Sequence, residues 1–114
     1  MSQEMVIFVR THDLLQWLLP KSERFPKSYR NTLTQRLMDS GLDLLEALTE
    51  AQSHRDQQRL SALRSADACL ARLRVYLRIA HQWQWLSHGQ YQHVSKMVAE
   101  IGRLLGGWLR QSQI

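Results

Sequence analysis

Apolar residues recur at spacings of three and four along most of this chain, which is the spacing of amphipathic α-helices. The pattern predicts a helix over residues 3–19 and a second over 27–53. A third should follow a polar turn at 53–56 and end near residue 85, and a fourth should begin after residue 87. No stretch alternates apolar and polar residues strictly enough to predict a β-strand, so the chain is expected to be all-α.

Each predicted helix has one apolar face that should form the core. In the first two helices the expected core residues are Met5, Phe8, His12, Leu15, Leu19, then Leu33, Leu37, Leu44, Leu48 and Ala51. In the last two they are Leu63, Ala66, Leu70, Leu73, Leu77, Ala80, then Val94, Val98, Ile101, Leu105 and Trp108. Short connections between such helices predict an antiparallel up-down-up-down four-helix bundle, forming a single domain over residues 1–114.

Local signals mark the ends of these helices. Pro20 and Pro26 predict a break between the first and second helix, because proline lacks an N–H and disfavours helix in the residue before it. Ser87 is a good helix N-cap, and Gln90 three places later completes the pattern of a capping box. Helices of about 25 residues would make the bundle a rod roughly 40 Å long.

The overall composition predicts a basic protein of one domain. The 114 residues include fifteen Lys and Arg against ten Asp and Glu, for a net charge of +5. Twelve of the fifteen cations are arginine, whose planar fork suits phosphate and carboxylate groups. The charge favours RNA, DNA or an acidic protein surface as partner, although arginine is also a good helix former on a solvated face.

The compartment is expected to be the cytoplasm. Cys69 is the only cysteine, so no disulfide can form within the chain. No apolar run reaches the length of a membrane span, and the N-terminal sequence MSQEMVIFVR does not have the pattern of a signal peptide. No membrane partner is therefore predicted.

The second predicted helix carries an acidic ridge, which consists of Asp39, Asp43, Glu46 and Glu50. Their spacing places all four carboxylates on one side of the helix, opposite its leucines. Two interpretations stay open. The ridge is either a solvated helix face or a docking surface for arginines of a neighbouring subunit.

The third predicted helix carries arginines beside its apolar face. Arg74 and Arg78 are one turn apart, and Arg64 and Arg72 lie on the same helix. Positions that flank an apolar seam are where a bundle meets a partner. The arginines are thus candidate contacts to phosphates or acidic side chains, with salt bridges inside the bundle as the alternative.

The fourth predicted helix carries a small-residue stripe, which consists of Ser95, Ala99, Gly102 and Gly106. A glycine inside a helix costs about 0.5–1 kcal/mol relative to alanine, so another contact should offset that cost. We expect a second backbone to approach closely here, either within the bundle or across a subunit interface. The acidic ridge and the small-residue stripe are therefore the candidate oligomer interfaces.

Trp83 and Trp85 raise a separate expectation. Two residues apart on one helix, they cannot share a face. One of them should therefore be exposed or buried in an oligomer interface.

The search for catalytic and metal-binding residues yields little. No two histidines have the i, i+4 spacing of a helical zinc site, and His12 is expected to be a core residue. Cys69 is expected to be an inert buried thiol. Arg74 and His81 match the spacing of the arginine and histidine in HEPN-type helical ribonucleases, but Val75 stands where those enzymes usually have a polar residue. We therefore predict no enzyme activity, no metal and no cofactor.

Several stretches together resemble a known family. They are LLQWLLPKSERFPKSYRNTLTQRL, DLLEALTEA, RSADACLARLRVYLRIA and VAEIGRLLGGWLRQ, and they cover nearly the whole chain. The chain resembles the accessory variability determinant (Avd) proteins of diversity-generating retroelements. Those proteins share a four-helix-bundle superfamily with proteins encoded by intervening sequences of bacterial ribosomal RNA genes. The most specific motifs are LRVYLR and EIGRLLGGWL.

The resemblance implies an assembly and partners. It implies a homopentameric barrel of bundles that pairs with a reverse transcriptase and template RNA or DNA and supports error-prone copying, without being a polymerase itself. By position it implies that Arg74, Arg78 and Arg103 contact the enzyme or nucleic acid, and Arg64, Arg72 and Arg110 complete the candidate set. The alternative is an interaction module of the ribosomal intervening-sequence type.

Overall fold

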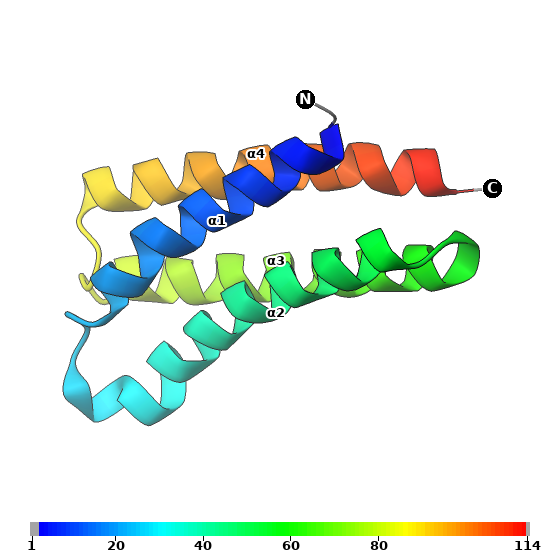
Figure 1. Cartoon of the computed structure of the whole chain (residues 1–114). Helices are drawn as coiled ribbons and strands as arrows, with labels where there is room; N and C mark the ends of the chain where they lie inside the picture. The colour runs from blue at the N-terminus through cyan, green and yellow to red at the C-terminus, as the bar shows by residue number, and fades with distance from the viewer. Residues whose placement is uncertain (1–2, 114) are drawn as a thin grey trace.

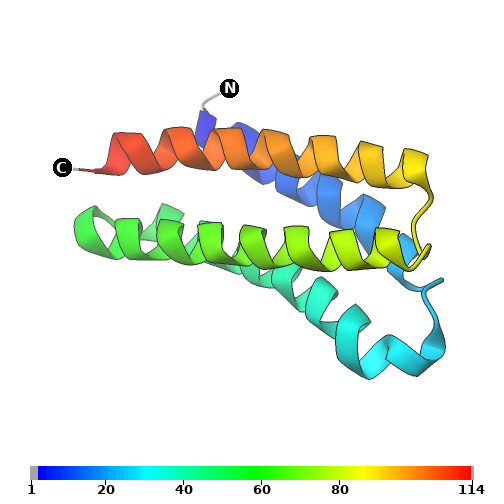
Figure 2. The same cartoon turned by 180° about the vertical axis from the view of Figure 1, so that it is seen from behind.

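A computed structural model describes residues 3–113 of the chain as four α-helices with no strand among them. The helices are α1 (Gln3–Ser22), α2 (Gln35–Ser53), α3 (Asp56–Gln82) and α4 (His88–Ser112). Figures 1 and 2 show that successive helices run in opposite directions, with α2 and α3 joined by a short hairpin at one end. The four-helix architecture expected from the sequence is therefore confirmed, and the molecule measures 45 × 25 × 19 Å.

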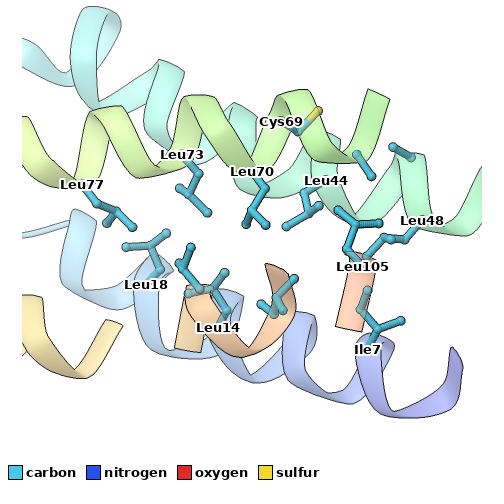
Figure 3. Close-up of a cluster of buried hydrophobic side chains, with 14 of the residues drawn as sticks. Ile7, Leu14, Leu18, Leu44, Leu48, Cys69, Leu70, Leu73, Leu77 and Leu105 are labelled. Carbon is cyan, nitrogen blue, oxygen red and sulfur yellow. The ribbon is translucent and has the colours of Figure 1, made fainter. Parts of the chain in front are cut away.

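The core is built from leucines that all four helices turn inward. Leu14, Leu44, Leu70 and Leu105 are each 0% exposed and come from α1, α2, α3 and α4 respectively. Figure 3 shows these side chains meeting between the helices. The core faces predicted for the third and fourth helices are confirmed, since every residue named for them is buried.

The face predicted for the first helix is wrong in part: Leu15 is buried as predicted, and Phe8 and Leu19 are half-buried. Met5 and His12 are exposed, whereas Ile7, Leu14 and Leu18 are buried. The buried face includes the polar Thr11, which interrupts the apolar pattern in the sequence. The Thr11 hydroxyl donates to the Ile7 carbonyl oxygen at 2.8 Å, so its burial leaves no unpaired group.

The helix boundaries near the two prolines also differ from those predicted. Helix α1 continues through Pro20 to Ser22. Pro20 leaves the carbonyl of Gln16 without its helical N–H donor, but Gln16 is exposed, so water can hydrate that carbonyl. The predicted second helix begins instead with a 3₁₀ turn, η1 (Lys27–Tyr29), and a π-helical turn, η2 (Arg30–Thr34), before α2 starts at Gln35.

Two capping motifs fix the connection between α3 and α4. The capping box predicted at Ser87 is present, with Gln90 N–H donating to the Ser87 hydroxyl at 3.1 Å. At the end of α3, Gln84 N–H donates to the His81 carbonyl and Trp85 N–H to the Ala80 carbonyl, which is the Schellman pattern. Gln84 takes the left-handed conformation, with φ of 64°, that this motif requires.

None of the helices that the structure describes is long and apolar enough to cross a membrane.

Candidate functional site

The site is a groove between α3 and α4 into which two arginines project. Arg74 extends from α3 across α4, where its Nη2 lies 2.5 Å from the point that a Cβ on Gly102 would occupy. Glycine is therefore what allows the guanidinium to lie against the α4 backbone. Arg78, one turn along α3, lines the same groove as Arg74.

The opposite wall of the groove comes from small residues of α4. Ser95 and Ala99 face Arg74 and Arg78 across a cavity of about 180 Å³, with Leu77 and Val98 beneath them. Small side chains on this wall leave the arginines room and leave the groove open. It thus offers two guanidinium groups above an apolar floor.

An aromatic stack closes one end of the groove. The rings of His81 on α3 and Tyr91 on α4 are stacked, with centroids 4.2 Å apart and planes 3° from parallel. Tyr91 also lines the groove beside Arg78. His88 lies next to the stack, with its ring centroid 5.8 Å from that of His81.

The arginines and the small-residue stripe were predicted separately, and the structure joins them in one site. The expectation that a second backbone approaches the stripe is wrong within this chain. The Arg74 side chain covers Gly102, and the Arg110 side chain lies 3.5 Å from the point that a Cβ on Gly106 would occupy. A contact of the stripe with another subunit stays a prediction.

Arg72 lies away from the groove. Its Nη2 donates to the Cys69 sulfur at 3.2 Å. Burial raises the pKa of the Cys69 thiol above its ordinary value of 9.0, and the neighbouring Arg72 opposes that shift. The negative charge of Asp43 on α2 also raises the pKa of this thiol, so Arg72 lies on the α2 side of α3. The predicted burial of Cys69 is confirmed, since the residue is 5% exposed.

Arg103 is paired rather than open. It donates to both carboxylate oxygens of Glu100, at 2.7 and 3.1 Å. This hydrogen bonding lowers the pKa of the Glu100 carboxyl and raises that of the Arg103 guanidinium. The positive charge of Arg10 on α1 also lowers the pKa of the Glu100 carboxyl. The Arg103–Glu100 pair therefore lies on the α1 side of α4. Arg103 therefore does not join Arg74 and Arg78.

The remaining candidate arginines are spread out. Arg64 is exposed on α3, and Arg110 is exposed in the last turn of α4. Of the six predicted binding residues, the structure therefore brings only Arg74 and Arg78 together in the groove.

The acidic ridge is exposed along its whole length. None of its carboxylates forms an ion pair with a described residue; the ion pairs among the described residues are Arg10–Asp13 and Arg103–Glu100. Asp39 accepts a hydrogen bond from Gln35 Nε2 at 3.0 Å. The ridge thus keeps its charge available, and its role as an oligomer interface stays a prediction.

The pair required for a helical ribonuclease does not converge. Arg74 lies against Gly102 and His81 stacks on Tyr91, and these α4 positions are about 16 Å apart along the helix. Over residues 3–113, no three His, Cys, Asp or Glu side chains are placed to hold a metal ion.

Sequence reasoning missed an aromatic cluster at the end of the bundle opposite the α2–α3 hairpin. Trp83 and Trp85 were expected to point apart, but α3 ends at Gln82 and the chain turns at Gln84. Their ring centroids are therefore 5.5 Å apart, and Tyr29 lies 5.4 and 5.2 Å from them. The expectation that one tryptophan is exposed is confirmed, because Trp83 is 52% exposed.

Comparisons with known proteins agree with this architecture. The sequence model of the bAvd-like family matches residues 5–112. A crystal structure from Bacteroides thetaiotaomicron VPI-5482, of a protein of unknown function from the S23 ribosomal protein family, has a TM-score of 0.86. It is 13% identical, and the alignment covers 96% of this chain and 99% of that one. No curated protein sequence matches the chain.

Proposed function

The chain belongs to the bAvd-like family, and on that basis we propose that it is a non-catalytic accessory subunit of a diversity-generating retroelement. In this role it binds the element's reverse transcriptase together with RNA or DNA and supports mutagenic reverse transcription in the cytoplasm. The family match over residues 5–112 carries the proposal.

The groove between α3 and α4 supplies the binding chemistry. Arg74 and Arg78 form no ion pair with a described residue, so their guanidinium groups are available to an external anion. Two arginines one turn apart suit successive phosphates of a nucleic acid or acidic side chains of the enzyme.

The assembly belongs to the same proposal. A closed ring of identical subunits needs two different faces on each subunit that fit together. The exposed acidic ridge on α2 is one such face, and basic or small-residue surfaces of a neighbouring subunit are its partner in a homopentamer.

A second candidate function is favoured by the structural likeness. The similar Bacteroides protein is described as a member of the S23 ribosomal protein family. An interaction module of the ribosomal intervening-sequence type would share this fold. The genes on either side separate the two proposals, since a reverse transcriptase with a template repeat and a variable repeat marks only the first.

Nucleic-acid binding is tested by its salt dependence. Each phosphate contact contributes about 0.7 to 0.9 to the slope of log affinity against log salt concentration. The double variant Arg74→Gln, Arg78→Gln should therefore lose about 1.4 to 1.8 from that slope. Arg55→Gln with Lys96→Gln removes the same charge outside the groove and is the matched control. An unchanged slope in the groove variant would remove both arginines from the binding surface.

A further inference from the structure

Two large aromatic side chains lie in the open at the end of the bundle where α1, α3 and the start of α2 meet. Trp83 is 52% exposed and Tyr29 is 38% exposed, and their rings pack edge to face at 5.4 Å. Trp83 directly follows α3, and Tyr29 ends the 3₁₀ turn η1. Exposed rings that are held in place by neighbouring rings are typical of binding surfaces.

A cleft opens beside these two rings. Its volume is about 410 Å³, and Tyr76 and Ile79 of α3 line it together with Asn31 and Arg36. Neither the Asn31 amide nor the Arg36 guanidinium has a hydrogen bond or ion pair to another described side chain. The cleft thus combines flat apolar walls with polar groups that are free to bind a ligand.

The exposed rings of Trp83 and Tyr29 are not needed to hold this end of the fold together. Phe25 and Trp85 already anchor the segment between α1 and α2 to the bundle, since Phe25 is 4% exposed and its ring lies 5.3 Å from that of Trp85. Trp83 adds a ring outside that contact, and about half of its surface remains open to solvent. An outer ring of this kind is available for stacking against a ligand.

The charge around the cleft indicates what the ligand is. The two segments that line the cleft, residues 29–36 and 76–83, contain no acid. Their cations are Arg30, Arg36 and Arg78, and Lys27 lies in the same 3₁₀ turn as Tyr29. The acidic ridge begins only at Asp39, one turn beyond Arg36. An anionic ligand with flat apolar parts is complementary to this surface.

We propose that Tyr29 and Trp83 form a stacking platform for unpaired bases of a single-stranded nucleic acid, with Lys27 and Arg36 beside it for the phosphates. Single strands bind through this combination, because every base has a face that can stack on an aromatic ring. The proposal rests on the proposed function. It adds a second contact surface, since the platform faces the start of α2 whereas the Arg74–Arg78 groove faces α4.

The test compares single-stranded and duplex binding by full-length variants. Fluorescence anisotropy is measured for a labelled 20-nucleotide RNA, alone and paired with its complement, over a range of salt concentrations. Removal of one stacking ring should weaken single-strand binding about five- to hundredfold. We expect this loss for Trp83→Ala and Tyr29→Ala, with little change for the duplex and an unchanged salt slope. Trp83→Phe should restore most of the affinity, and circular dichroism checks that each variant is folded.

The outcomes separate this proposal from the one on which it rests. If the wild type binds no RNA even at low salt, the nucleic-acid part of the proposed function fails and the platform fails with it. If the wild type binds with a clear salt slope but Trp83→Ala and Tyr29→Ala bind the single strand equally well, only the platform is wrong. Loss of reverse-transcriptase binding in Trp83→Ala with RNA binding intact would make the cleft a protein-docking site and overturn the proposal.

Discussion

The guanidinium group of Arg74 lies on the backbone of Gly102, with Nη2 2.5 Å from the position of a Cβ at that residue. Two features that look unrelated in the sequence, an arginine on α3 and a glycine inside α4, therefore form one contact. The glycine gives up helix stability, and the arginine occupies the space it leaves. This relationship makes the position of Arg74 testable without changing its charge.

Gly102→Ala should move Arg74 out of its place while keeping the fold. The added methyl group displaces the flexible end of Arg74, and alanine favours the helix by about 1 kcal/mol, so the melting temperature should stay the same or rise by roughly 4 °C. Affinity for nucleic acid should nevertheless fall. Calorimetry and anisotropy measure the two effects, and Gly89→Ala, whose Cβ would meet nothing within 4 Å, is the control.

Gln84→Gly should stabilise the protein. Gln84 has φ of 64° in the Schellman turn that ends α3, and a side chain is unfavourable in that conformation. Relief of this strain should raise the free energy of unfolding by about 1 kcal/mol in urea titrations. A lower stability of the glycine variant would show that the glutamine side chain makes a contact that outweighs the strain.

Cys69 should react slowly and should make the stability depend on pH only in the alkaline range. Burial raises the pKa of its thiol above 9.0, so the native state holds the proton more tightly than the unfolded state does. The resulting contribution is fully present below pH 9.0 and is lost as the pH rises through the native pKa. Urea midpoints at pH 8 and pH 10 should thus differ more for wild type than for Cys69→Ala. Alkylation at pH 8 should be more than about tenfold slower in the native than in the unfolded protein.

Charge reversal on the acidic ridge should break the assembly if the ridge joins subunits. Its carboxylates have no cation partner among the described residues, so Asp43→Lys with Glu46→Lys would place like charges against a basic neighbouring surface. Light scattering should then show a mass near 13.4 kDa in place of five times that value. Glu23→Lys with Asp67→Lys makes the same charge change elsewhere. An intact pentamer in the ridge variant would count against the ridge as the interface.

Much of the fold could be predicted because each helix repeats its leucines at helical spacing. The face of α1 could not, because the buried Thr11 is polar and its hydroxyl is satisfied inside the helix by the Ile7 carbonyl. Periodicity alone therefore selected Met5 and His12 instead.

The candidate site was predictable only in its parts. Spacing placed Arg74 and Arg78 beside the core and found the small residues of α4, but how two helices align is decided by three-dimensional packing. The contact between Trp83 and Trp85 depends on the end of α3 at Gln82 and on the left-handed Gln84, which no helical pattern reveals. Arg103 looked equivalent to Arg74 until the structure paired it with Glu100.

The most direct test of the account is co-purification of this protein with the reverse transcriptase encoded beside it. Wild type should retain the enzyme, and Arg74→Glu with Arg78→Glu should lose it, while Arg55→Glu with Lys96→Glu, which changes the charge equally outside the groove, should retain it. Failure of the wild-type protein to bind any such enzyme would contradict the proposed function. Equal retention by both double variants would contradict the groove as its contact surface.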